Sequence, residues 1–412
     1  MAGIVRIGAD LEPGVTFARP APADLRGGRI TEGSIVPAEI VGLGIAVPPY
    51  VLTNADLESL VDTDDQWITE RTGIKERRIA GPGESTGGLG RKAASRALDS
   101  AGLGVDDIDL LIVATATPDY PLPSAACILQ AELGMRRGAA MDVIAGCAGF
   151  VYALATASNY IATGMASTAL VVGAETLSRI TDYTDRSTCI LFGDGAGAAV
   201  LRAGERGIMG AALGTDGSRA GLLFTQAGGS RLPASAHTTA ARFHYMRMDG
   251  KAVFKSAVTE MAASSLLAIE RAGLTLGDID LVVPHQANQR IIDATTRRLK
   301  APPERVVSNI ARYGNTSAAS IPIALGEAWS QGRVQPGQHV LFTAFGAGLA
   351  WGSMVLSWTL PTPPAQVGEE ATSSALPVVK GMLDGSLWDG EPPLPLRRAA
   401  VAEQAAALEG SA

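Results

Sequence analysis

"AGLGVDDIDLLIV" (residues 101–113) and "AGLTLGDIDLVVP" (residues 272–284) are two copies of one motif, offset by 171 residues. The offset aligns Asp107 with Asp278 and Asp109 with Asp280. Each copy follows an alanine-rich segment of helical pattern and leads into a short apolar run. Such a run is typical of a strand that is covered on both faces.

The similarity continues beyond this motif, because in both halves small residues open a second helical segment that leads to another apolar run. These segments are 146–164 followed by 169–175, and 314–332 followed by 339–345. Their common order predicts a duplicated α/β architecture. We place the N-terminal half at residues 36–208 and the C-terminal half at 209–360.

The two ends of the chain differ from these halves. Residues 1–35 show no periodicity, and residues 361–412 are rich in proline, alanine and glutamate. We expect both to be extensions outside the core fold, the C-terminal one partly disordered.

Composition narrows the class of protein. The 412 residues are 47% hydrophobic and 18% charged, with a net charge of −7, which gives no reason to expect a nucleic-acid partner. No apolar run reaches the ~18 residues of a membrane span. The three cysteines form neither a disulfide framework nor a zinc motif, so we expect no metal and a cytoplasmic location.

Cys147 lies in "MDVIAGCAGFVYALATA" (141–157), where a strand-like pattern gives way to a helical one. A helix start favours an anion, so we expect the pKa of this thiol to be lowered. Its small neighbours leave room for a substrate. Cys127 and Cys189 have apolar neighbours instead and are predicted to be small hydrophobic residues.

His285 and Asn315 are the other two candidates for chemistry. His285 follows an apolar strand, at the edge where side chains enter a cleft. Asn315 begins the helical segment that the repeat pairs with that of Cys147; its alternative role is helix capping. A thiolate can take an acyl group while imidazole and amide N–H groups stabilise an enolate, which is chemistry for carbon–carbon bond formation.

The glycine-rich stretch "FGDGAGAAV" (192–200) contains G-x-G-x-G. A dinucleotide fingerprint requires a strand, a turn and then a helix, whereas a strand-like run follows here. We therefore expect tight packing at this stretch rather than cofactor binding.

Eight motifs together resemble the β-ketoacyl-ACP synthase III enzymes of the thiolase superfamily in order and spacing, over residues 37–360. The motifs are "NADLESLVDTDDQWITERTGIKERRI" (54–79), "PSAAC" (123–127), "AGCAGFVYAL" (145–154), "TDRST" (184–188), "FGDGAGAAVL" (192–201), "VPHQANQRII" (283–292), "GNTSAAS" (314–320) and "FGAGLAWGS" (345–353).

This resemblance implies a thiolase fold, five alternating layers of helix and sheet (α-β-α-β-α), and a homodimer. It implies that Cys147 takes an acyl group from acyl-CoA, and that His285 and Asn315 support the decarboxylative condensation with malonyl-ACP. The N–H groups of Cys147 and Ala347 would form the oxyanion hole, although many relatives have glycine at the latter position. No cofactor is implied besides the acyl-CoA substrate.

The resemblance also implies binding residues. Those for CoA and its pantetheine arm are Thr63, Trp67, Arg71, Arg186, Gly250, Phe254, Ala287 and Asn288. Those for docking an acidic acyl carrier protein are Arg290, Lys255, Arg297 and Arg298. Leu122 falls where relatives often carry phenylalanine at the end of the acyl pocket, which would admit a longer or branched starter.

Two other functions stay open alongside this one. An acyltransferase would pass the acyl group from Cys147 to an alcohol, amine or thiol without condensation, although it has less need of both His285 and Asn315. A silent subunit would have no use for an intact Cys147. The sequence leaves open the starter, the extender unit, and whether the product enters fatty-acid or polyketide biosynthesis.

Overall fold

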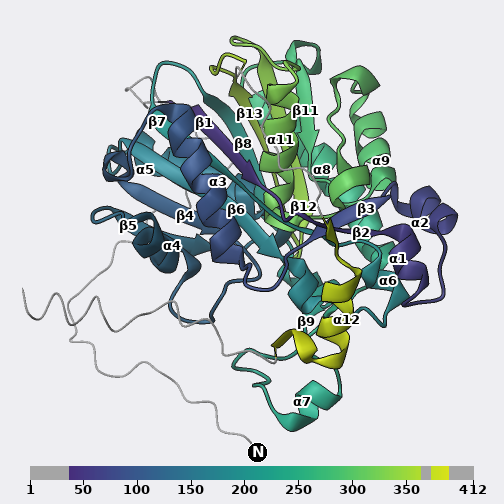
Figure 1. Cartoon of the computed structure of the whole chain (residues 1–412). Coiled ribbons are helices and arrows are strands. Elements are labelled where there is room, and N and C mark those ends of the chain that lie inside the picture. Colours follow the sequence, from purple (N-terminus) through teal and green to yellow (C-terminus); the bar gives the residue numbers. More distant parts are fainter. Residues whose placement is uncertain (1–36, 363–372, 389–412) are drawn as a thin grey trace, which may run out of the picture. The chain divides into compact units, whose positions relative to one another are not determined.

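The computed structural model describes residues 37–362 and 373–388 (Figure 1). Two mixed β-sheets face each other across a pair of buried helices, and further helices cover both outer faces. This is the five-layer α/β arrangement predicted from the sequence. Smaller elements surround the two sheets.

The first sheet has the strand order β1-β7-β6-β4-β5. Strands β6, β4 and β5 are parallel to one another, while β7 is antiparallel to both of its neighbours. The strands are β1 (Ala38–Ala46), β4 (Leu110–Ala114), β5 (Ala139–Val143), β6 (Thr168–Thr176) and β7 (Asp194–Ala203).

The second sheet repeats this pattern with one strand fewer, in the order β11-β12-β13-β8. The fifth position is reduced to a single parallel bridge between Val282 and Val306. The strands are β8 (Ile208–Thr215), β11 (Leu281–Pro284), β12 (His339–Gly346) and β13 (Ala350–Ser357). The predicted boundary between the halves, after residue 208, falls at the start of β8.

Six helices complete the layers. Helices α3 and α4 pack on the outer face of the first sheet, α8 packs on the outer face of the second sheet with α9 against it, and α5 and α11 lie between the sheets. Their bounds are α3 (Thr86–Ala101), α4 (Ala125–Leu133), α5 (Gly149–Ala162), α8 (Gly250–Arg271), α9 (Gln289–Leu299) and α11 (Ser320–Ser330).

The all-apolar strands β4 and β11 contribute side chains to apolar clusters on both faces of their sheets. In β4, Leu111 and Val113 face the outer helices, while Leu110 and Ile112 face the central layer. In β11, Val282 faces the opposite side from its two neighbours. This explains why neither strand shows polar alternation.

The repeated aspartates have matching roles. The Asp109 carboxylate accepts hydrogen bonds from the N–H groups of Ser167 and Thr168 at the start of β6, with distances of 2.8 and 3.2 Å. The Asp280 carboxylate accepts one from the N–H of His339 at the start of β12, at 2.9 Å. Each aspartate therefore links the residue before its own strand to the start of the neighbouring parallel strand in the sheet.

The glycine-rich stretch of residues 192–200 is mostly strand β7 and not a phosphate-binding loop. A Cβ added to Gly197 would lie 2.6 Å from the Cβ of Pro322 in α11. The glycine is required for this close approach of helix to sheet, as the sequence predicted.

The remaining elements form a smaller group beside the sheets. The strands are β2 (Tyr50–Thr53), β3 (Glu76–Ile79), β9 (Leu223–Thr225), β10 (Met246–Met248) and β14 (Ser373–Ser374). The helices are α1 (Asn54–Glu58), α2 (Asp65–Thr72), α6 (Arg186–Cys189), α7 (Ala236–Ala240), α10 (Ile310–Tyr313) and α12 (Leu376–Asp384).

Among the residues that the structure describes, helix α8 alone is long and apolar enough to cross a membrane, by length and composition only. Half of this stretch is buried, and the helix packs against β8, β12 and β13. Its apolar composition is therefore explained by its place in the core.

Part of the C-terminal extension belongs to the core, so the expectation that all of residues 361–412 lie outside it is wrong. Strand β14 pairs in parallel with β2, and the Ala375 N–H donates to the carbonyl of Val51. Val378 and Val379 of α12 are buried in the same apolar cluster as Leu52. The expectations for residues 1–35 and for the tail after residue 388 fall outside the described residues.

We predict that Val379→Asp detaches residues 373–388 from the core, because Val379 is fully buried. Losing the burial of one such side chain costs about 1.5–3 kcal/mol, and a buried charge without a partner costs more. Limited proteolysis with mass spectrometry should show new cleavage between residues 373 and 388. Leu383→Asp is the matched control, since Leu383 is exposed; equal cleavage of both variants would contradict the docking.

Candidate active site

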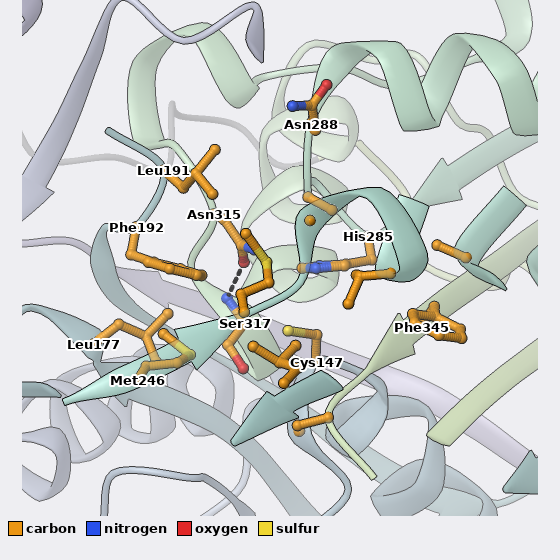
Figure 2. A pocket seen from close by; sticks show the side chains of 18 of the residues that line it. Cys147, Leu177, Leu191, Phe192, Met246, His285, Asn288, Asn315, Ser317 and Phe345 are labelled. Atoms are coloured by element: carbon orange, nitrogen blue, oxygen red, sulfur yellow. Dashed lines mark hydrogen bonds between the residues drawn. The ribbon is translucent and has the colours of Figure 1, made fainter. Parts of the chain in front are cut away.

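A largely apolar cavity of about 270 Å³ brings together the three residues singled out for chemistry. Cys147, His285, Asn315 and Ser317 all line it (Figure 2). Ala347 also lines it. Residues far apart in the sequence therefore meet in one site.

Cys147 reaches this cavity from the turn between β5 and α5. The turn is a short 3-10 helix, Gly146–Ala148, and it contacts the corresponding turn Ser317–Ala319 that precedes α11. The repeat therefore places both helix starts at one point between the sheets.

His285 follows β11 directly, and its backbone N–H donates to the carbonyl of Thr343 in β12. The side chain is buried, and its Nδ1 has no hydrogen-bond partner in the described part of the chain. Burial lowers the pKa of His285 to about 3. The imidazole is therefore neutral at physiological pH.

Asn315 is fixed by its own backbone and side chain. Its N–H donates to the carbonyl of Leu191, and its carbonyl accepts from the N–H of Gly193. Its side-chain oxygen Oδ1 accepts from the N–H of Ser317 at 2.9 Å. This bond closes a tight turn, but the N-cap of the Ser317–Ala319 helix is Thr316, so the capping role considered from the sequence is wrong. The NH₂ group of Asn315 stays available as a donor in the cavity.

The backbone amides of Cys147 and Ala347 are close neighbours. A Cβ on Gly346 would lie 2.3 Å from the amide nitrogen of Cys147, and one on Gly146 would lie 2.7 Å from that of Ala347. Only glycine permits this approach. Two N–H groups are thereby held next to the thiol.

The predicted lowering of the Cys147 pKa is wrong for the protein without substrate. Burial raises the pKa of this thiol to about 12, the Ser317 hydroxyl opposes the rise, and the charge of Glu175 adds to it. The effect of burial, which raises the thiol pKa, thus outweighs the effect of the start of α5, which lowers it. The thiol is protonated at neutral pH.

Sequence reasoning missed two residues beside the thiol, Ser317 and Glu175. The Ser317 hydroxyl partly opposes the rise in the pKa of both the Cys147 thiol and the Glu175 carboxyl group. Glu175 is fully buried, and burial raises the pKa of its carboxyl group. The available signal was an acidic residue at the end of an otherwise apolar strand, in "ALVVGAE".

The residues expected to bind CoA fall into two groups. Gly250, Phe254, Ala287 and Asn288 line the cavity. Thr63, Trp67, Arg71 and Arg186 do not line it and lie on α2, on the loop before it and at the start of α6.

Two guanidinium groups lie over the ring of Trp67. The Arg71 and Arg186 guanidinium carbons are 4.7 and 4.8 Å from its ring centroid. Asn288 joins this group to the cavity, because its amide donates to the carbonyl of Arg71 at 3.1 Å while its oxygen caps α9. A flat ring and two cations thus lie near the cavity rim.

Leu122 does not line the cavity of its own chain, contrary to its predicted place in the acyl pocket. It lies between two prolines in the loop before α4, and its side chain is 86% exposed. The apolar lining comes instead from residues that include Leu177, Leu191, Phe192 and Met246 (Figure 2).

The four basic residues predicted to dock a carrier protein are all exposed. They lie on two helices that pack together, α8 and α9. These residues are Lys255, Arg290, Arg297 and Arg298. Within residues 37–362 and 373–388, no three His, Cys, Asp or Glu side chains are grouped so as to hold a metal ion.

Comparison with known proteins agrees with this geometry. The family model for 3-oxoacyl-[acyl-carrier-protein] synthase III matches residues 141–217, and the model for the C-terminal part of that enzyme matches residues 269–358. Beta-ketoacyl-[acyl-carrier-protein] synthase III of Symbiobacterium thermophilum is 53% identical over 326 residues, covering 79% of this chain and 99% of that protein.

Solved structures show the same relationship. The 3-oxoacyl-[acyl-carrier-protein] synthase III of Aquifex aeolicus is 46% identical, with a TM-score of 0.72 over 78% of this chain and 100% of that one. The priming β-ketosynthase of the R1128 polyketide pathway is 36% identical, with a TM-score of 0.75 over 80% and 98% of the two chains.

The fold and the central cysteine define a thiolase-fold acyltransferase of the condensing type. The chain belongs to the β-ketoacyl-ACP synthase III family. The resemblance inferred from its motifs is confirmed.

The low pKa of His285, about 3, predicts a specific pH dependence of stability. Between the unfolded value near 6.5 and this folded value, the unfolded chain binds one more proton, so the free energy of unfolding falls as the pH falls. The free energy of unfolding, measured in urea, should fall by about 2 kcal/mol less for His285→Gln than for wild type when the pH is lowered from 6.5 to 5. His237→Gln, at an exposed position, controls for loss of a histidine; identical pH dependence in all three proteins would contradict the burial of a neutral imidazole.

Proposed function

We propose that Cys147 takes an acyl group from acyl-CoA and that His285 and Asn315 then support its decarboxylative condensation with malonyl-ACP. The observation that carries this proposal is the meeting of the three side chains in one apolar cavity. The product would be a β-ketoacyl-ACP for fatty-acid or polyketide biosynthesis.

Acylation uses the groups around the thiol. The sulfur of Cys147 forms a bond to the thioester carbonyl carbon as the thiol gives up its proton. The bond from that carbon to the CoA sulfur breaks, and CoA leaves as a thiol with one proton. The N–H groups of Cys147 and Ala347 are suited to donate hydrogen bonds to the oxygen that becomes negative in the tetrahedral intermediate. Such donors are effective because the surrounding cavity is apolar and their positions are fixed.

Condensation needs donors that are neutral before the reaction. The imidazole N–H of His285 and the amide of Asn315 would donate to the thioester oxygen of the malonyl group. Loss of CO₂ then leaves an enolate whose negative oxygen these donors stabilise, and its carbon bonds to the acyl carbon on Cys147. The bond from that carbon to the Cys147 sulfur breaks, and the released thiolate takes up one proton. A histidine that stays uncharged suits this role, and no metal or prosthetic group is needed.

The starter unit is proposed to be a hydrocarbon acyl chain. The cavity wall around Cys147 is formed mostly by aliphatic and aromatic side chains. An apolar chain gains about 0.8 kcal/mol for each CH₂ group that it buries there.

The nucleotide end of CoA is proposed to bind at Trp67, with adenine entering between its ring and Arg186. In the free protein these two side chains stack on each other, while Arg186 also donates to the Asp62 carbonyl at 2.6 Å. The carrier protein is proposed to dock on the exposed basic residues of α8 and α9, beside the loop that carries His285.

The first experiment is intact-protein mass spectrometry after incubation with a panel of acyl-CoAs and then malonyl-ACP. We expect acylation that is absent in Cys147→Ala and that malonyl-ACP discharges with release of CO₂. Asn315→Ala should still be acylated but condense about 10²–10³-fold more slowly, the usual effect of removing one such donor. An acyl-enzyme that malonyl-ACP leaves untouched would instead support transfer without condensation, and acylation of Cys147→Ala would contradict the proposed nucleophile.

Two variants should separate the two half-reactions. Trp67→Ala should raise KM for acyl-CoA by about 5- to 150-fold, as expected from 1–3 kcal/mol of base stacking, and leave acyl-pantetheine unaffected. Arg290→Glu should slow only the reaction with malonyl-ACP, by roughly tenfold at low salt. Steady-state kinetics with each substrate in turn tests both; equal effects on the two half-reactions would contradict the assigned surfaces.

A further inference from the structure

Arg77, in the short strand β3, is a fully buried arginine. Within the part of the chain that the structure describes, it forms no ion pair with a carboxylate, and its acceptors are two backbone carbonyls and one side-chain amide. Burial lowers its pKa only to about 10, so the guanidinium stays charged at neutral pH. Burying a cation without a counter-ion is costly, so we expect the guanidinium to do something that an apolar side chain could not.

Three segments of the chain meet at this guanidinium. Its Nη1 donates to the Leu52 carbonyl at 3.1 Å and to Asn54 Oδ1 at 3.0 Å. Its Nη2 donates to Asn54 Oδ1 at 3.0 Å and to the Ile190 carbonyl at 2.8 Å. Leu52 lies in β2, Asn54 begins α1, and Ile190 follows α6. A guanidinium is suited to joining these segments, because its N–H groups form a rigid fork.

Asn54 fixes the orientation of the guanidinium. Its amide nitrogen donates to the Asp65 carboxylate and to the Ile74 carbonyl, both at 2.8 Å. Its oxygen therefore faces Arg77 and accepts from both terminal nitrogens. Asp65 begins α2 and Ile74 follows the end of that helix, so Arg77 is also tied to the helix that carries Trp67.

The wall segment, residues 190–193, begins with the carbonyl that the guanidinium binds and continues into the active site. Leu191 and Phe192 line the cavity. The same segment makes both backbone hydrogen bonds of Asn315. The Asn315 N–H donates to the Leu191 carbonyl at 2.8 Å, and the Asn315 carbonyl accepts from the Gly193 N–H at 3.0 Å. The position of Asn315 therefore depends on the position of the wall segment.

The aliphatic stem of Arg77 lies where the wall segment meets the residues before Asn315. A Cβ added to Gly193 would lie 3.1 Å from the Cβ of Arg77, and one added to Gly314 would lie 3.3 Å from it. The stem is thus close to the backbone on both sides of the bonds that hold Asn315. A shorter or displaced side chain at residue 77 would leave both segments without this support.

We propose that Arg77 is a positioning residue for condensation, which holds the wall segment, and through it Asn315, where the Asn315 amide meets the malonyl thioester. This proposal rests on the function proposed above. Arg77 does not line the cavity and acts only through the backbone of the wall segment.

The nucleophile is held by other parts of the chain. Cys147 lies on the turn before α5, and the backbone amide beside its own is that of Ala347. In the described residues, neither of these two is hydrogen-bonded to the wall segment. Loss of Arg77 should therefore slow condensation far more than acylation.

Single-turnover kinetics of the two half-reactions test this expectation. Each protein is acylated with an acyl-CoA that acylates wild type, freed of CoA and mixed with malonyl-ACP, and mass spectrometry follows the acyl group. Arg77→Met should acylate within about threefold of the wild-type rate yet condense about 10²-fold more slowly, the loss expected when a reacting group is misplaced by about 1 Å. Because condensation is measured per acyl-enzyme, unfolded protein does not enter its rate.

Arg77→Lys and Arg96→Met are the companion variants. A lysine keeps the charge but not the fork, so condensation in Arg77→Lys should be about tenfold slow, between Arg77→Met and wild type. Arg96 also donates to a backbone carbonyl, that of Ile45 at 2.7 Å, but it lies in α3 on the outer face of the first sheet, so Arg96→Met should condense as wild type does. Equal slowing of both half-reactions in the Arg77 variants, or no acyl-enzyme from either of them, overturns the proposal.

A double variant tests whether Arg77 acts through Asn315. In Asn315→Ala the amide to be positioned is gone, so adding Arg77→Met should slow condensation by less than about threefold more. Fully additive losses would show that Arg77 acts elsewhere and would overturn the proposal. If wild type forms no acyl-enzyme, or one that malonyl-ACP leaves untouched, the proposed function fails instead.

Discussion

The contact between two helix starts, buried between the two sheets, is the constraint on which the active site depends. The turn that holds Cys147 packs against the turn after Asn315, and small residues make this possible. A Cβ on Gly173 would lie 2.4 Å from the carbonyl oxygen of Ala318. A larger residue there would push the second turn off the first sheet, and the thiol would lose its neighbours.

The same burial sets the charge state of the site. Burial raises the pKa of the Cys147 thiol and lowers that of His285, so the thiol is protonated and the imidazole neutral in a largely apolar cavity. In such surroundings, fixed N–H donors stabilise a developing oxyanion more strongly than water does. The substrates bring the reacting charge with them, since malonyl arrives as a carboxylate and loses that charge as CO₂.

The duplicated α/β architecture and the three central residues could be predicted from sequence, because they depend on local patterns repeated in the same order in both halves. The charge state of Cys147 could not, because the cost of burial depends on side chains from distant segments. Glu175 shows the same limit, since its partners Thr115 and Thr117 lie about 60 residues away. Docking of α12 was missed because composition does not reveal which sheet edge is free.

The two halves share one backbone plan but divide the chemistry. Under the repeat, Cys147 corresponds to Ala318 and Gly146 to Ser317, so the residues that react differ where the backbone does not. The first half supplies the nucleophile and a buried acid, while the second supplies neutral donors and a hydroxyl. Because both sets of residues lie on turns of the same geometry, substitutions in these turns could change the function without changing the fold. A serine in a strained conformation that glycine normally adopts is what such a substitution would leave behind.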